Sequence, residues 1–241
     1  MMAKTTKKKT LPSHLTDFEK LAGVILLLVY LVVLPFFGRA ITDAVGTLLG
    51  TSISPALSNV ICFYLLFAAA VLIFHSFLYQ TSQTLFTGIE RCLKTLGLGL
   101  VFFYGLNELF YRVSHLLWGN LTNLNDAALL SQLFTAPRIM ALVVIFLAPF
   151  LEELLFRGLI FGWLREHSRA VAYIASCVLF ALLHVWQYAL VHQDISYLLV
   201  MAQYFVPGFI FTWAYDHSGS LWTSVGIHAA VNALAVWAVL M

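Results

Sequence analysis

The chain has 241 residues, of which 61% are hydrophobic and only 10% are charged, and its formal net charge at pH 7 is +2. A soluble domain of average composition has about a quarter of its residues charged, so this composition excludes an ordinary soluble protein and indicates a polytopic membrane protein. The small net charge also argues against nucleic acid as a partner.

The N-terminal residues are polar, carry five lysines and precede a first long apolar run. No A-x-A-like cleavage site follows this run, so we expect a basic tail and a transmembrane helix rather than a signal peptide. The apolar segments predict an all-α polytopic transmembrane helix bundle of about seven (six to eight) spans, with breaks at Pro149 and at Pro207–Gly208. The expected spans are residues 21–37, 57–79, 93–118, 138–164, 170–191, 195–215 and 220–240.

Loop charges orient these spans. If the basic tail is cytoplasmic, the connections that carry Arg91 and Lys94, and Arg165 and Arg169, also lie inside, as the positive-inside rule requires. We therefore expect a multi-pass protein of the cell membrane with a cytoplasmic N terminus. The expected division of the chain is a basic cytoplasmic tail, then N-terminal membrane helices with an outer loop, then a helical core that holds the site, over residues 1–20, 21–137 and 138–241.

The third expected span contains one pair of opposite charges. Glu108 and Arg112 are four residues apart and therefore lie on one face of a helix. We interpret them as an ion pair near a helix end, and the alternative is a role in substrate access.

The stretch from Leu147 to Leu164 is apolar except for two glutamates and one arginine. Glu153 and Arg157 are four residues apart with the acid first, the better orientation for an ion pair on a helix. Glu152 points about 100° away and lacks such a partner. Because ionisable groups inside a membrane helix mark functional sites by default, Glu152 is the candidate for chemistry.

Two later spans place further polar groups at a similar depth. Phe180 and His184 are four apart in one span, and His228 and Asn232 are four apart in another. From the expected inner ends, Glu152 and Asn232 lie at a depth of roughly 18 Å, His184 at roughly 21 Å and His228 at roughly 12 Å. We therefore expect these polar side chains to converge on one wet cavity.

These residue types suit hydrolysis by activated water. Glu152 would serve as general base, and His184 would orient the water or later protonate the leaving amine. His228 and Asn232 would offer hydrogen-bond donors to the developing oxyanion. No serine or cysteine nucleophile is needed in this arrangement.

Metal binding is the rival use of the same groups, with Glu152, His184 and His228 as zinc ligands. Asparagine is a poor zinc ligand and no H-E-x-x-H motif is present, so we expect no cofactor and keep a single divalent zinc ion as the alternative. Three cysteines without a C-x-x-C pair predict neither a zinc site nor a disulfide framework. We expect them to be packing residues; they are Cys62, Cys92 and Cys177.

The polar positions form three motifs, E-E-x-x-x-R, F-x-x-x-H and H-x-x-x-N. They read Glu152-Glu153-x-x-x-Arg157, Phe180-x-x-x-His184 and His228-x-x-x-Asn232. In these motifs, and over residues 138–240, the chain resembles the CPBP family of CAAX prenyl proteases and bacteriocin-processing enzymes, also called the Abi family.

The resemblance implies an intramembrane endopeptidase in which Glu152 activates water with His184. By the same resemblance, His228 and Asn232 form the oxyanion hole. Glu153, Arg157 and Phe180 support the site structurally. Family members are also widely named metalloproteases, which leaves the metal question open.

The leading hypothesis is cleavage of a peptide or protein substrate that is embedded in the bilayer or anchored to it by a lipid. The motifs of other intramembrane proteases, G-x-S-x-G, H-E-x-x-H and G-x-G-D, are absent from the sequence. One alternative is a non-catalytic bacteriocin self-immunity or membrane scaffold protein of the same fold. Another is a proton-coupled transporter, although the paired halves with interrupted helices common in transporters are missing. The oligomeric state and the substrate stay open.

Overall fold

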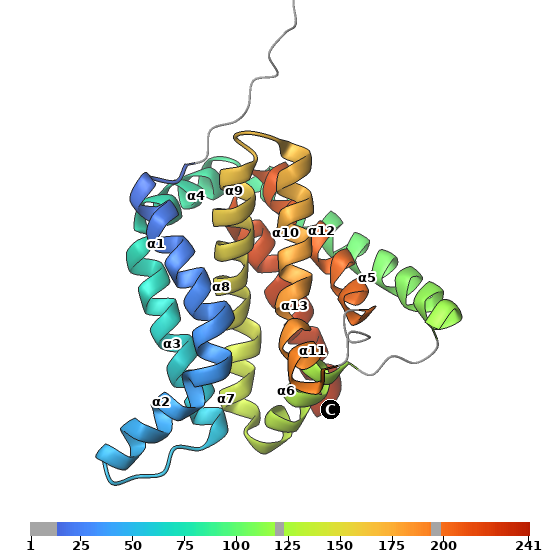
Figure 1. Ribbon diagram of the computed structural model, residues 1–241. Helices are drawn as coiled ribbons and strands as arrows, with labels where there is room; N and C mark the ends of the chain where they lie inside the picture. The colour runs from blue at the N-terminus through green and yellow to red at the C-terminus, as the bar shows by residue number, and fades with distance from the viewer. Residues whose placement is uncertain (1–13, 119–122, 194–198) are drawn as a thin grey trace, which may run out of the picture.

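The computed structural model describes residues 14–118, 123–193 and 199–241. Within these ranges the chain forms helices and no strand, which confirms the predicted all-α bundle. Figure 1 shows the long helices standing side by side, with α5 leaning away from the others. The predicted start of the sixth span at Ile195 lies outside the described residues, as do four lysines of the predicted tail, Lys4, Lys7, Lys8 and Lys9.

The N-terminal part begins with one continuous helical rod that contains a π-helical stretch, η1. The rod comprises α1 (Asp17–Leu28), η1 (Val29–Val33) and α2 (Leu34–Leu48). It is followed by α3 (Pro55–Ile73), α4 (His75–Thr87) and α5 (Ile89–Trp118).

The second predicted span, residues 57–79, is wrong as a single helix because the chain turns at Phe74. A new helix, α4, begins there, and the buried Glu19 of α1 stabilises its start: Glu19 Oε1 accepts a hydrogen bond from the backbone N–H of Phe77 at 2.8 Å. The same carboxylate closes a capping box with Thr16 at the start of α1. The buried carboxylate of Glu19 therefore accepts backbone hydrogen bonds at the N-terminal ends of two helices, α1 and α4.

The C-terminal part holds a second continuous rod, interrupted by two π-helical stretches. The rod comprises α7 (Pro137–Leu142), η2 (Val143–Leu147), α8 (Ala148–Glu153), η3 (Leu154–Phe161) and α9 (Gly162–Leu164). The helix α6 (Leu124–Thr135) precedes it in the predicted outer loop. The remaining helices are α10 (Arg169–Leu183), α11 (Trp186–His192), α12 (Met201–Ser218) and α13 (Leu221–Leu240).

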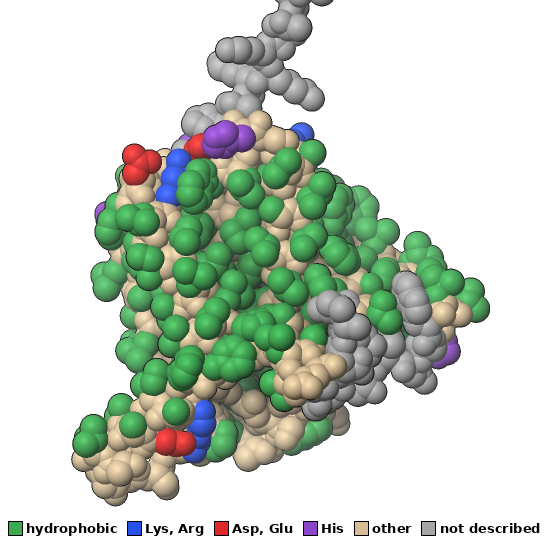
Figure 2. Space-filling view, in the orientation of Figure 1, with side chains coloured by type: hydrophobic (Ala, Val, Ile, Leu, Met, Phe, Trp, Pro, Cys, Tyr) green, Lys and Arg blue, Asp and Glu red, His purple; other side chains and the backbone are tan. Residues whose placement is uncertain are grey.

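Four described helical stretches are long and apolar enough to cross a membrane: Asp17–Leu48, Pro55–Ile73, Pro137–Leu164 and Leu221–Leu240. The other three predicted spans fall on α5, α10 and α12. Charged side chains make α5 more polar, and α10 has only 15 residues. Figure 2 shows hydrophobic side chains across the middle of the visible face and charged ones near its two ends, as a bilayer requires.

One break in the structure was not expected from the sequence. The fifth predicted span, residues 170–191, is broken at His184, where α10 ends. Its ring Nδ1 lies 2.9 Å from the carbonyl oxygen of Phe180, while its backbone N–H bonds to Ala181. The ring therefore bonds to the Phe180 carbonyl oxygen, which the backbone N–H of His184 would use if the α-helix continued.

The predicted break at Pro207–Gly208 is wrong, because α12 runs straight through both residues. Gly208 lies against α10 so closely that an added Cβ would be 3.4 Å from the Cα of Cys177. This packing holds α12 in place, and a proline within a membrane helix is tolerated when neighbouring helices support it.

The rod that contains α8 is the centre of the bundle. In its most apolar window, 61% of the residues are buried, against 22% to 28% in the other three candidate spans. The rod can be approached closely: a Cβ added at Gly23 of α1 would lie 3.1 Å from a methyl group of Leu159 and 2.5 Å from the ring of Phe74. Only glycine lets the first helix pack at this distance.

Candidate active site

The carboxylate of Glu152 is the point where four elements meet. Its Oε1 accepts a hydrogen bond from the hydroxyl of Tyr30 at 2.9 Å. Its Oε2 lies 4.0 Å from Nε2 of His184 and 3.9 Å from Nε2 of His228. Glu152 is 7% exposed, and the structure thus brings together three of the four residues for which we predicted one cavity.

Glu152 and Glu153 occupy a short α-helical segment, α8, between two π-helical stretches. In η2 the backbone N–H of Ala148 bonds to the carbonyl oxygen of Val143, five residues earlier. In this register the next residue, Pro149, would bond to Val144, but proline has no N–H to donate. The predicted effect of Pro149 is therefore a carbonyl left without its helical partner, and π-helical stretches are frequent at functional sites.

Asn232 bonds to this carbonyl. Its side-chain Nδ2 donates a hydrogen bond to the Val144 oxygen at 2.8 Å, which fastens α13 to the rod just before Pro149. A carboxamide has two N–H donors, so one remains for another acceptor. Asn232 is thus anchored beside α8, but no contact among the described residues joins it to Glu152.

We expect Asn232 and Pro149 to be thermodynamically coupled. Asn232→Leu should destabilise the protein by about 1–3 kcal/mol, because it leaves the partly buried Val144 carbonyl unpaired. In a Pro149→Ala background the restored N–H can bond to Val144, so the cost of Asn232→Leu should fall by about 1 kcal/mol. Unfolding of the parent, the two single variants and the double variant in mixed micelles measures this difference, and additive effects would contradict it.

Glu153 and Arg157 form the predicted ion pair, with Arg157 Nη1 at 3.1 Å from Glu153 Oε1 and both side chains fully buried. Arg157 Nη2 also donates to the carbonyl oxygen of Gly208 at 3.0 Å. Its guanidinium lies over the rings of Phe180 and Phe211, at 4.2 and 5.4 Å from their centroids. Arg157 therefore ties the rod to α10 and α12, and Phe180 packs against this cation.

Glu153 makes further contacts, to α13, that the sequence did not predict. Its Oε1 lies 2.9 Å from Nδ1 of His228, and its Oε2 accepts a short hydrogen bond from Ser224. A carboxylate accepts hydrogen bonds, so Nδ1 of His228 carries the proton and Nε2 is directed toward Glu152. The interpretation of Glu153 as a purely local partner of Arg157 was incomplete.

Each of the two histidine rings stacks on an aromatic ring of α12. His184 stacks on Tyr204 with centroids 4.2 Å apart, and His228 stacks on Phe211 at 4.5 Å. The Tyr204 hydroxyl donates to Oδ1 of Asp126 in α6 at 3.2 Å, so α6 is linked to the ring that supports His184.

Some of the missed residues left a signal in the sequence and others did not. Ser224 stands four residues before His228 and therefore shares its helix face, a spacing that could have been read. Tyr30, Tyr204 and Phe211 lie on other helices, and an aromatic residue in an apolar helix does not reveal what it faces.

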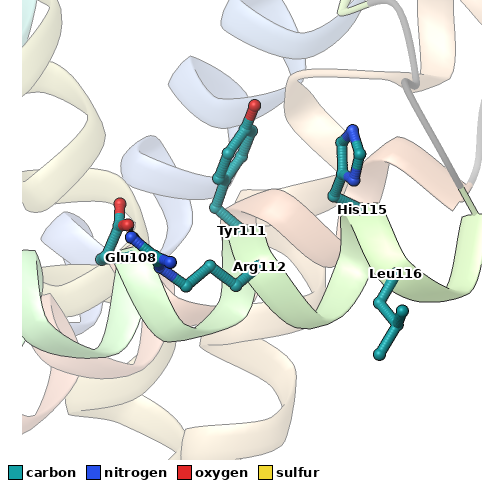
Figure 3. Close-up of a pocket in the computed structure, with 5 residues that line it drawn as sticks. All are labelled: Glu108, Tyr111, Arg112, His115 and Leu116. Carbon is teal, nitrogen blue, oxygen red and sulfur yellow. Dashed lines mark hydrogen bonds and ion pairs between the residues drawn. The ribbon is translucent and has the colours of Figure 1, made fainter.

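A second group of polar side chains lies on the C-terminal half of α5 (Figure 3). Arg112 Nε and Glu108 Oε1 are 2.7 Å apart, with side chains 74% and 57% exposed, which confirms the predicted local ion pair. The two residues line a shallow pocket on this helix. The other residues that line the pocket are Tyr111, His115 and Leu116, all from α5. No contact among the described residues connects the group to Glu152.

A metal ion would need some rearrangement of these groups. The described residues contain no cluster of three or more His, Cys, Asp or Glu side chains arranged to hold a metal. Ligands on one tetrahedral zinc ion lie about 3.3 Å apart, given bonds of about 2.0–2.1 Å, so Glu152 and the two histidines would have to move closer together. The three cysteines are free, and Cys92 and Cys177 are buried, as expected for packing residues.

Fold and site together define a helical membrane bundle with a buried carboxylate, a buried imidazole and a second, partly buried imidazole at its centre. Residues 133–234, which contain all three motifs, match the family model described as Type II CAAX prenyl endopeptidase Rce1-like. The match covers less than half of the chain, and over this segment it confirms the resemblance to the CPBP family that the motifs show.

Two curated proteins are similar to parts of the chain. The chain is 31% identical over 113 residues to the "Putative membrane peptidase YdiL" of Bacillus subtilis (strain 168), which covers 46% of this chain and 41% of that protein. It is 37% identical over 86 residues to the "UPF0177 protein YxdF" of Lactococcus lactis subsp. lactis (strain IL1403), covering 36% and 42%. The chain thus spans less than half the length of these relatives. No solved structure matches it.

Proposed function

We propose that the protein is an intramembrane endopeptidase that hydrolyses a peptide bond of a membrane-embedded or lipid-anchored substrate with activated water. The observation that carries this proposal is the separation of Glu152 Oε2 from the two histidine Nε2 atoms, 4.0 and 3.9 Å. These distances are too long for direct hydrogen bonds, and one water with contacts of about 2.8 Å can bridge them.

The hydrogen bonds of His184 support its role beside the base. A carbonyl oxygen only accepts, so Nδ1 of His184 donates to Phe180, and Nε2 of the neutral ring is an acceptor. A water that donates one proton to Glu152 and the other to His184 has its lone pairs free for attack. Its oxygen bonds to the substrate carbonyl carbon while Glu152 takes a proton. When the C–N bond breaks, a proton passes to the leaving amine.

His228 and Asn232 are the proposed donors to the oxyanion. Glu153 accepts from Nδ1 of His228 and so fixes the orientation of the ring, and a proton carried on Nε2 would be the one donated to the oxyanion. Asn232 contributes its second amide proton, since the first is bound to Val144. Glu153 and Arg157 hold the helix that presents Glu152.

Charges at one end of the bundle support a cytoplasmic N terminus. Lys20 at the start of α1 pairs with Glu166 at 3.4 Å, and Arg165 and Arg169 pair with Asp216 at 3.4 and 2.5 Å. These basic residues cluster where α1 and α10 begin, and positive charge favours the cytoplasmic side. We propose this orientation, with residues 138–241 as the catalytic core.

Cleavage of a peptide library by the purified protein tests the function, with Glu152→Ala, His184→Ala and Glu108→Ala measured beside the parent. We expect the parent and Glu108→Ala to cleave, with and without chelator, and the first two variants to fail. Equal cleavage by all four proteins would overturn the proposal. Loss of cleavage in chelator with recovery on added zinc would instead assign the water to a metal ion.

A further inference from the structure

Tyr30 reaches the proposed catalytic carboxylate from outside the segment that matches the family. It lies in η1, the π-helical stretch of the first rod, and is 5% exposed. Its hydroxyl donates to Glu152 Oε1 at 2.9 Å, a contact between residues 122 positions apart in the chain. The matched segment begins only at residue 133, so this donor comes from outside that segment.

The hydroxyl is not needed for packing. The Tyr30 ring meets Phe63 edge to face at 6.0 Å, a contact that phenylalanine would make equally well. A buried hydroxyl without a partner is costly, so a tyrosine at this place is favourable only because Glu152 accepts its proton.

The contact also gives the two carboxylate oxygens of Glu152 different roles. A carboxyl group can rotate about its terminal bond, and that torsion is broad. With Oε1 bound to Tyr30, the plane of the group is fixed and Oε2 is directed toward His184 and His228. A base held in this way meets the water in one orientation, which is where positioning contributes most to rate.

We propose that Tyr30 is a positioning residue that orients the Glu152 carboxylate for hydrolysis, and that the first helix is therefore part of the catalytic centre. This inference rests on the proposed function. It assigns to the N-terminal part of the chain a role in the reaction rather than in membrane anchoring alone.

Steady-state kinetics on the library peptide that the parent cleaves best provide the test. Tyr30→Phe should lower kcat by about ten- to a hundredfold and leave KM unchanged, because the lost hydrogen bond acts on the base and not on the substrate. Tyr173→Phe is the matched control: it also removes a hydroxyl that donates to a carboxylate, that of Asp216 at 3.0 Å, and should keep the parent kcat.

Glu152→Gln, measured in the same assay, separates the two proposals. If Glu152→Gln is inactive while Tyr30→Phe has the parent kcat, the inference about Tyr30 is wrong and the proposed function stands. If Glu152→Gln is as active as the parent, the proposed function itself fails. A raised KM with an unchanged kcat in Tyr30→Phe would place the tyrosine in substrate binding and overturn its positioning role.

A second variant covers the case in which Tyr30→Phe does not fold. Site-specific 4-fluorophenylalanine at position 30 keeps the size of the ring but carries a fluorine in place of the hydroxyl, so it cannot donate a hydrogen bond to Glu152 Oε1. We expect this variant to have a lower kcat than the parent and the same melting temperature. An unchanged kcat would contradict the inference.

Discussion

Replacement of Glu152 by glutamine is expected to lower kcat for peptide cleavage by about 10²- to 10⁴-fold, the usual contribution of a general base. Glutamine has nearly the shape of glutamate, and its amide oxygen can still accept the hydrogen bond from Tyr30. The variant therefore removes the ability to take a proton from water while it keeps the packing of α8.

The matched control is Glu108→Gln on the exposed part of α5, where the carboxylate pairs only with Arg112. Its kcat should equal that of the parent. Melting temperatures in detergent should be measured for both variants, so that a loss of activity is not confused with a loss of folded protein. Parent-like turnover by folded Glu152→Gln would show that another group activates the water.

The second large effect concerns two glutamate–arginine pairs that are identical in spacing and opposite in environment. Arg157→Met should destabilise the protein by about 3–5 kcal/mol, because it leaves the fully buried charge of Glu153 without its cation. It also leaves the Gly208 carbonyl without the hydrogen bond from Arg157. Arg112→Met, in the exposed pair, should cost less than about 1 kcal/mol.

Free energies of unfolding in mixed detergent micelles, taken from denaturant titrations of both variants and the parent, measure the contrast. Similar losses for Arg157→Met and Arg112→Met would contradict it. Such a result would mean that Ser224 and His228 compensate the Glu153 charge by themselves.

The sequence predicted the parts of the site that depend on position within one helix. Spacing of four residues identified the Glu153–Arg157 pair, and counting residues from expected helix ends placed Glu152, His184 and His228 at a common depth. These inferences hold because rise and turn per residue are nearly constant along an α-helix. Depth along a helix is therefore accessible without a structure.

Contacts across helices were not accessible, because they depend on how each helix is rotated about its axis. Two π-helical stretches, η2 and η3, change the rotation of the rod on either side of α8. No residue pattern in the sequence predicted these stretches. The bond from Tyr30 to Glu152 and that from His228 to Glu153 follow from this rotation. The end of α10 at His184 was missed because a side chain, not a proline or glycine, stops the helix.

The order of the site residues along the chain has a consequence for biosynthesis. Tyr30 lies in η1 and His228 in α13, while Glu152 and His184 lie between them in the sequence. During synthesis and insertion, the chain therefore carries the carboxylate before the imidazole of α13 exists. The proposed hydrolytic centre is assembled only when α13 has entered the bundle, so a chain inserted up to α12 is unable to cleave other proteins in the membrane.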